Sequence, residues 1–151
     1  MSVYYDYIFY EGLKMSTTTW FPSLSQDSWV TDSSLQADYL LAQAYETNYS
    51  QSQLYPGKVT SIAKIIQENN NNIGGTCTAL AKSLTEYFSR YFHNVVVEVK
   101  QTSASVASGS SLAEIEMYIS VTDKKGVVIS LGKLLNITNS KINMVKNIIN
   151  N

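Results

Sequence analysis

The sequence predicts an α+β fold in which a helical N-terminal half packs on a small antiparallel β-sheet. Apolar residues recur at intervals of three and four between residues 33 and 92, which is typical of amphipathic helices. From residue 95 onward they alternate with polar residues, as in half-buried strands. Helices followed by strands indicate a sheet that is covered on one face. The 151 residues predict a single domain, with an extended N-terminal arm and loop over residues 1–32 and an α+β body over residues 33–151.

The first 32 residues combine aromatic side chains with a lack of helical periodicity. Residues 3–10, VYYDYIFY, predict a strand with apolar side chains on both faces, which is either covered twice or lies on a partner. Residues 14–32 predict a loop, and a loop of this length in a compact domain usually has a function or contacts something else. We therefore expect the aromatic residues of this region to form a partner interface: Tyr4, Tyr5, Tyr7, Phe9, Tyr10, Trp20, Phe21 and Trp29.

Three helices are expected in the first part of the body. The first begins at Ser33, because the sequence SSLQ matches a capping box. The second covers residues 58–69 and ends at a run of asparagines, which favour turns, followed by Gly74 and Gly75. The third runs from about Thr76 to Phe92, with apolar residues at helical spacing: Leu80, Leu84, Phe88 and Tyr91.

Three strands and a short C-terminal helix complete the prediction. The strands cover residues 95–100, 112–121 and 127–131, and Gly126 suits the turn between the last two. Residues 101–111, QTSASVASGSS, predict a flexible linker. Ser140 is expected to cap the final helix, which has apolar residues on one side: Ile142, Val145 and Ile149.

Cys77, the only cysteine, stands near a predicted helix start, where the thiolate is favoured. The stretch GGTCTALAKSLTEYF resembles the nucleophile region of transglutaminase-like and papain-like thiol enzymes, which need an imidazole beside the thiol. The only histidine, His93, lies sixteen residues away at the far end of the same predicted helix, roughly 24 Å along its axis. We therefore expect a buried structural thiol and no catalytic residue. A thiol enzyme that uses Cys77, or its inactive descendant, is the alternative.

Other site chemistry finds little support in the sequence. A single cysteine excludes a disulfide framework and a cysteine-based zinc site, and no metal or nucleotide motif occurs, so no cofactor is expected. Glu114 and Glu116 share one strand face, about 7 Å apart, where two carboxylates could bind a cation or act in glycoside hydrolysis. The sequence offers no third ligand or second carboxylate pair, which favours a solvated face. A module that docks a peptide or glycan around these two residues is a further possibility. No apolar run predicts a membrane span, and the lysines lack the aromatic neighbours typical of sequence-specific nucleic-acid binding.

Composition and charge favour contacts between subunits. Only 15% of the residues are charged, against roughly 25% in typical soluble domains. The chain has eleven tyrosines, a residue that is enriched at interfaces. Codon usage in an AT-rich genome explains the composition equally well. Residues 1–50 have a net charge of −5 and residues 51–151 of +4, which suits unlike surfaces that meet between subunits. Chance scatter of a few charges would produce the same split.

The order of these segments resembles that of small virion proteins of tailed bacteriophages. A helical half ends in TALAKSLTEYFSRYF and is followed by NVVVEVK, a flexible loop, AEIEMYISVTDKKGVVISL and a short helix, over residues 33–150. The resemblance is to neck, head–tail connector and tail-completion subunits. It implies a structural protein without enzymatic activity, which forms a homo-oligomeric ring beside portal, neck or tail proteins in the virion and assembles in the cytoplasm of the host bacterium. Baseplate wedge proteins have a similar passage, but they carry Glu-Pro-Arg where this chain has YFHN at residues 91–94.

Overall fold

The computed structural model describes residues 21–22, 29–30, 32–47, 60–69, 72–105 and 112–148. The chain divides into two compact units, Met1–Gln36 and Ala37–Asn151. In the first unit, β1 (Phe21–Pro22) pairs antiparallel with β2 (Trp29–Val30), so a short hairpin lies within the predicted loop. Only the backbone is described at Phe21 and Trp29. The other predicted interface residues and the predicted arm over residues 3–10 lie outside the described residues.

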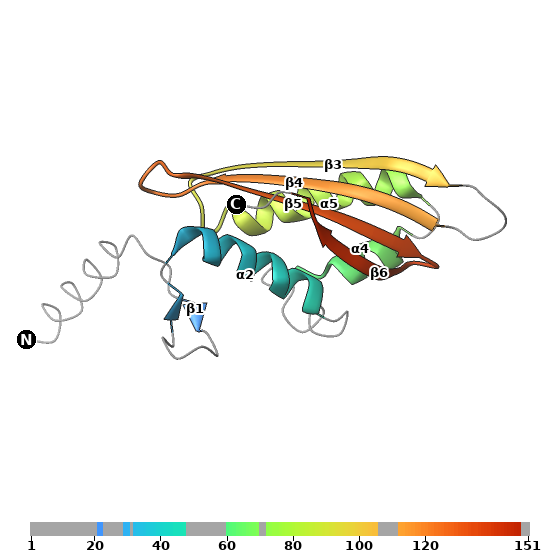
Figure 1. Ribbon diagram of the computed structural model, residues 1–151, viewed down its shortest axis with the longest axis horizontal. Helices are drawn as coiled ribbons and strands as arrows, with labels where there is room; N and C mark the ends of the chain where they lie inside the picture. The colour runs from blue at the N-terminus through green and yellow to red at the C-terminus, as the bar shows by residue number, and fades with distance from the viewer. Residues whose placement is uncertain are drawn as a thin grey trace, which may run out of the picture. The chain divides into compact units, whose positions relative to one another are not determined.

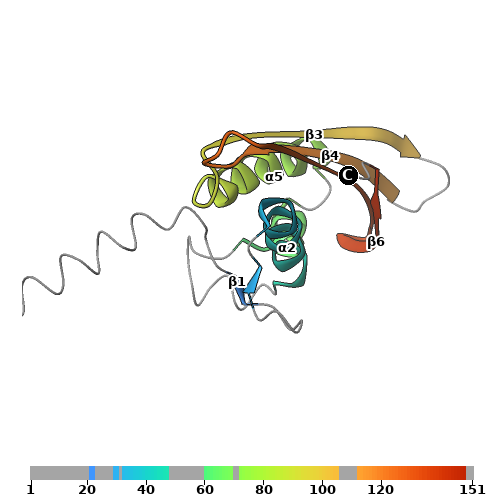
Figure 2. The same cartoon turned by 60° about the vertical axis from the view of Figure 1, so that its left-hand side comes forward.

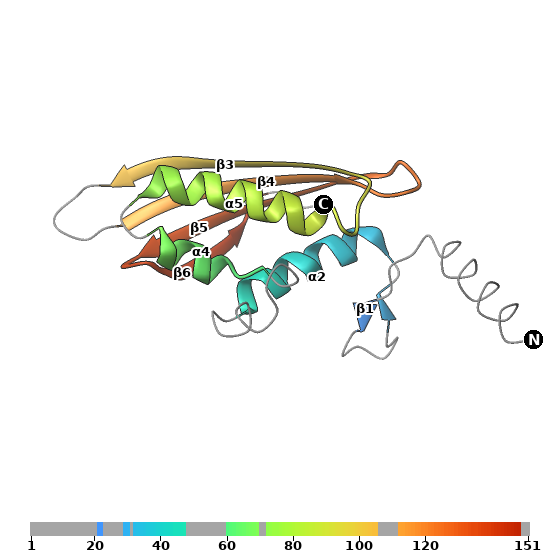
Figure 3. The same ribbon diagram turned by 180° about the vertical axis from the view of Figure 1, so that it is seen from behind.

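The second unit confirms the α+β class and the antiparallel sheet. Its helices are α2 (Ser33–Glu46, which begins in the first unit), α4 (Ile62–Glu68) and α5 (Ile73–Phe88). Its strands are β3 (Asn94–Ser105), β4 (Leu112–Thr122), β5 (Val128–Thr138) and β6 (Lys141–Asn147), in the spatial order β3-β4-β5-β6. Figures 1 and 2 show the helices on one face of this sheet. Seen from behind, α5 runs beside β3 and β4, which it contacts (Figure 3).

The core lies between the helices and the side chains that alternate along β4. Five residues of β4 face the helices, and each is at most 5% exposed: Ala113, Ile115, Met117, Ile119 and Val121. The helices contribute fully buried aliphatic and aromatic side chains, among them Leu40 and Leu41 of α2 and Leu80, Leu84 and Phe88 of α5. Burial of one such large side chain stabilises the fold by about 1.5–3 kcal/mol. The alternation predicted for residues 112–121 is therefore confirmed.

The predicted C-terminal helix is wrong, because residues 141–147 form the edge strand β6. The two residues before it, Asn139 and Ser140, have φ angles of 51° and 60°. Positive φ at both positions matches a type I′ turn, whose twist suits a two-residue hairpin. Thr138 and Lys141 pair directly across this turn. Ser140 is therefore a turn residue and not a helix cap, and β6 satisfies backbone groups of β5 that a helix would leave unpaired.

The predicted linker over residues 101–111 is partly wrong. Residues 101–105 belong to β3, which pairs with β4 beyond an irregularity between Gln101 and Ser103. Residues 103–105 extend the strand because Glu114, Ala113 and Leu112 of β4 pair with them beyond this irregularity. Residues 106–111 lie outside the described residues.

Helix α2 is capped by Asp32, one residue before the predicted cap at Ser33. Asp32 Oδ1 accepts hydrogen bonds from the Ser34 hydroxyl at 2.6 Å and from the backbone N–H groups of Ser34 at 2.8 Å and Leu35 at 3.3 Å. The Ser34 hydroxyl, followed by the Leu35 and Ser34 amides, holds the pKa of Asp32 below its usual value. A carboxylate also suits the positive end of the helix dipole.

Helix α5 begins earlier than predicted, so the Gly74-Gly75 pair lies in its first turn and does not break it. The N-cap is Asn72, whose Oδ1 accepts a hydrogen bond of 2.9 Å from the Gly75 N–H. A Cβ atom on Gly75 would lie 2.7 Å from Asn72 Nδ2, whereas a Cβ on Gly74 would come no closer than 3.8 Å to the same side chain. Glycine at position 75 therefore lets the cap approach the backbone.

Replacing Asp32 with alanine is expected to lower the free energy of unfolding by about 1 kcal/mol at neutral pH. Because the folded-state pKa of Asp32 is depressed, the cap stabilises the fold above the unfolded-state pKa and loses its effect as the pH falls through the folded value. Urea unfolding should therefore show a difference between wild type and Asp32→Ala that shrinks below about pH 4. Asp32→Asn keeps a cap without a charge and is the control; a difference that persists unchanged at pH 2 would contradict the assignment.

Gly74→Ala and Gly75→Ala are expected to differ in stability although they make the same chemical change. Alanine at position 74 should gain about 0.5 kcal/mol from helix propensity. Alanine at position 75 displaces the Asn72 side chain and should lose a cap of about 1 kcal/mol. Urea unfolding measures both values. In an Asn72→Ala background the difference between the two variants should shrink to the small effect of Asn69 Oδ1, which a Cβ at position 75 would meet at 3.2 Å. A difference that is undiminished there would disprove the role of the cap.

Candidate functional site

The outer face of the sheet, opposite the helices, carries a mixed polar and apolar surface. Along β4 this face presents Glu114, Glu116, Tyr118 and Ser120, because it takes the residues that alternate with the buried row. The two glutamates therefore share the outer face, as the sequence predicts. The residues that the structure describes include no group of three or more His, Cys, Asp or Glu side chains that could hold a metal ion.

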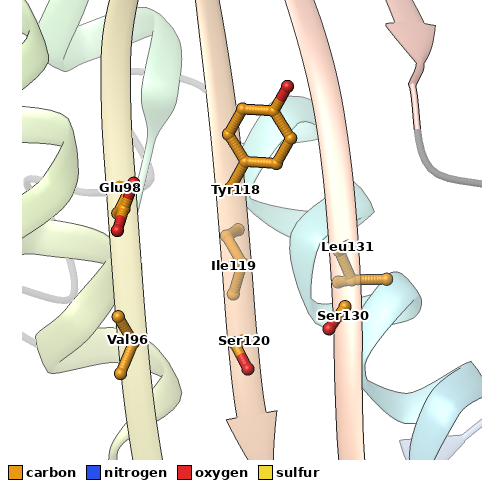
Figure 4. Close-up of a pocket in the computed structure, with 7 residues that line it drawn as sticks. All are labelled: Val96, Glu98, Tyr118, Ile119, Ser120, Ser130 and Leu131. Carbon is orange, nitrogen blue, oxygen red and sulfur yellow. The ribbon is translucent and has the colours of Figure 1, made fainter.

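A depression of about 160 Å³ lies on this face over β3, β4 and β5 (Figure 4). Tyr118 pairs with Glu98 on β3 and with Gly132 on β5, so no side chain from β5 stands beside its ring. This volume is close to that of a cavity that holds one benzene molecule, and it is well below the several hundred Å³ of typical ligand pockets. The depression therefore suits one side chain of a docked partner. Its lining residues are Val96, Glu98, Tyr118, Ile119, Ser120, Ser130 and Leu131.

The ionisable groups around this depression pair with one another. Glu98 Oε2 lies 2.8 Å from Lys100 Nζ. This contact lowers the pKa of Glu98 and raises the pKa of Lys100, so both groups are charged at neutral pH. The Tyr118 hydroxyl donates a hydrogen bond of 3.3 Å to Glu116. A general acid or base would need a pKa shifted toward neutrality, and Glu98 and Lys100 are shifted the opposite way.

Cys77 lies in the second turn of α5 and is partly exposed, so the predicted buried thiol is only half correct. Thr76, at 1% exposure, takes the fully buried position on that side of the helix. Desolvation raises the pKa of the Cys77 thiol, which keeps it protonated, whereas a nucleophilic cysteine needs a lowered pKa.

His93 is exposed and lies beyond the end of α5, which stops at Phe88 and not at the predicted Phe92. Its backbone N–H donates to the Thr122 carbonyl at 2.9 Å, at the start of the sheet. From Cys77 to the end of α5 the helix rises roughly 16 Å. The structure therefore does not bring the thiol and the imidazole together.

Lys133 is a nearly buried cation that the sequence analysis did not single out. It occupies a position in the helix-facing row of β5 and its side chain is only 13% exposed. Its ammonium group lies 2.9 Å from Asp38 of α2 and 2.6 Å from the Asn147 side-chain oxygen of β6. The sequence signal for Lys133 is a lysine within a row of alternating residues whose other members are apolar: Ile129, Leu131, Leu135 and Ile137. It links one helix and two strands, which is a structural role.

A group of exposed apolar side chains lies along β6, whereas Val96 of β3 and Val128 of β5 are more exposed single residues. This strand pairs with β5 and lies at one edge of the described sheet (Figure 1). Met144, Val145 and Ile148 are 48%, 43% and 36% exposed. Met144 points to the outer face, because it pairs with Asn136, and Val145 points to the helix face beside Leu135. We call residues 141–148 the β6 edge; it is the candidate functional site, and it was missed because a helix was predicted there.

Comparison of the chain with protein-family models, with curated proteins and with solved structures finds no match. Among the described residues, no helix combines the length and the apolar character needed to cross a membrane.

Alkylation of Cys77 is expected to be slow under native conditions. Because desolvation raises the pKa of the thiol, little thiolate is present at pH 7, and iodoacetamide should react more slowly with the folded chain than with a short peptide around Cys77. The reaction should reach the peptide rate in denaturant, and mass spectrometry measures both rates. Faster labelling of the folded chain than of the peptide would revive the thiol-enzyme alternative.

Proposed function

We propose that this protein is a structural virion subunit that forms an oligomeric ring in the neck, head–tail connector or tail of a tailed bacteriophage. The observation that carries this proposal is the β6 edge, whose exposed apolar side chains lie on both faces of an edge strand. Such an edge is a template for pairing with another chain. Its exposed lysines, Lys141 and Lys146, are charges that protect an edge against most strands, but they leave it open to a strand that carries acidic residues. An edge of this kind favours assembly.

The sequence supports the same proposal from a different direction. The aromatic residues of the first 32 positions, the low fraction of charged residues and the unequal charge of the two ends suit contacts between unlike surfaces of neighbouring copies. Contacts between two different patches are head-to-tail and close into a ring when the rotation permits. The phage assignment rests on the resemblance in composition and in the order of helices followed by strands, whereas the short final helix of that resemblance is the strand β6 in this chain.

The chemistry of the described residues gives the thiol-enzyme alternative no support. The Cys77 thiol has a raised pKa, and the depression near Tyr118 is small and is bordered by a paired glutamate. A surface that docks one partner side chain fits a structural subunit. The docking of a peptide or glycan around Glu114 and Glu116 is a weaker proposal, because neither residue lines the depression on the outer face of the sheet.

The expected oligomer can be tested in solution and in particles. Sedimentation velocity at micromolar concentration should show one closed species of several subunits. Mass spectrometry of gradient-purified phage particles, produced by the genome that encodes the chain, should detect it at the stoichiometry of a ring. The particle measurement also covers a ring that forms only on a neighbouring virion protein. A chain that is monomeric in solution and missing from the particles would refute the proposal.

A further inference from the structure

We propose that the β6 edge binds residues Val3–Tyr10 of a neighbouring copy, which add to the sheet as a fifth strand. This inference rests on the proposed assembly function and names the contact that builds it. Addition of an extended segment to a sheet edge takes its affinity from main-chain hydrogen bonds and its specificity from alternate side chains. The backbone, the side chains and the charges of the β6 edge each support this occupant.

The backbone of β6 offers hydrogen-bonding groups to a further strand. The Ile148 N–H donates to the Gly132 carbonyl of β5 at 3.0 Å. In an antiparallel pair, alternate residues direct their N–H and C=O groups to the same neighbour. The register therefore turns the amides of Val145 and Asn147 away from β5, toward the side of β6 on which no described strand pairs.

The side chains of the two segments match in length and pattern. The strand β6 has seven residues, and the segment VYYDYIFY at positions 3–10 has eight. Apolar side chains are exposed on both faces of β6, at Met144 and Val145. The segment likewise has apolar side chains at its odd-numbered and its even-numbered positions, so as a strand it would present them on both faces. Each face of the added strand would then cover apolar surface of β6.

The charges of the two segments are opposite. Residues 124–151 contain five lysines and no acidic residue, and Lys141 and Lys146 lie exposed on β6 itself. Residues 1–13 contain Asp6 and Glu11 and no basic residue. Opposite charges across two strands favour their pairing. The like charges of the lysines disfavour pairing between two copies of β6. This argues for the N-terminal segment as occupant and against a second β6.

A proline at position 145 tests the backbone contact in the full-length chain. Val145→Pro removes an N–H that points away from β5, so it should block strand addition while the β5–β6 pairing remains. Val145→Thr keeps that N–H and a side chain of similar size. Sedimentation velocity should show the proline variant as a monomer and the threonine variant as an assembled species, both with wild-type circular dichroism. An assembled proline variant would overturn the inference.

Charge reversal provides a test that does not depend on proline. Lys141→Glu with Lys146→Glu should weaken assembly about tenfold or more at low salt, because two attractive contacts become repulsive. Adding Asp6→Lys and Glu11→Lys to the same chain should restore assembly. Failure of this rescue, with all variants folded, would exclude the N-terminal segment as the charged partner and would point to a different protein as the occupant.

Cross-linking distinguishes a contact between copies from a contact within one chain. In a Cys77→Ala background, one differently tagged copy carries Tyr5→Cys and the other carries Val145→Cys. Oxidation of the mixture should join the two tags in one product, whereas no such product would form if the segment bound only its own chain or bound elsewhere. Should wild-type rings form without this cross-link, the inference fails and the assembly function stands; should no ring form and the particles lack the chain, the assembly function itself fails.

Discussion

The alternation of side chains along β4 is the constraint on which the rest of the structure depends. Its helix-facing residues are almost completely buried, and the strand pairs with β3 on one side and β5 on the other in a fixed register. A shift by one residue would move Ile115, Met117 and Ile119 into solvent and place Glu114 and Glu116 against the helices. The cost of several exposed large side chains and buried charges, on the order of 10 kcal/mol, is comparable to the whole stability of a typical domain. The register of β4 therefore determines which face of the sheet the helices cover.

Once the register is set, the weaker interactions and the open surfaces follow from it. Alternation along β5 places Lys133 on the helix side, where it is stabilised by Asp38 and Asn147 and ties α2 and β6 to the sheet. Alternation along β6 places Val145 toward the helices and Met144 toward the outer face, although neither face is fully covered there. Among the described residues, the sheet thus ends at a strand whose apolar side chains stay partly exposed, and in the proposed assembly a neighbouring copy would cover them.

Helices and strands with a regular apolar period could be predicted from the sequence. Elements whose start or type depends on a single residue or on a turn could not. The helices, the strand β4 and the first parts of β3 and β5 follow from spacing, because burial enforces a period that the sequence records. Both β3 and β5 run several residues beyond the predicted ends at residues 100 and 131. Asp32 was not predicted as the N-cap of α2, because the capping-box motif SSLQ begins one residue later, at Ser33. The strand β6 was read as a helix because Ile142 and Val145 are three residues apart, a spacing that a short strand with an irregular register also allows. The turn signal at Asn139-Ser140 lacks the glycine that usually marks a type I′ hairpin. The β6 edge could not be predicted as a candidate site, because the exposure of its side chains and its position depend on the order of the strands in the sheet.

Hydrogen–deuterium exchange along β6, measured in dilute and in assembled protein, tests most directly whether this edge is covered in the assembly. The account predicts that the amides of Val145 and Asn147 exchange quickly in dilute monomer and become strongly protected when the chain assembles, while the buried amides of β4 are protected in both states. Equal and rapid exchange of the β6 amides in the two states would contradict it, because the open edge would then have no partner in the assembled protein.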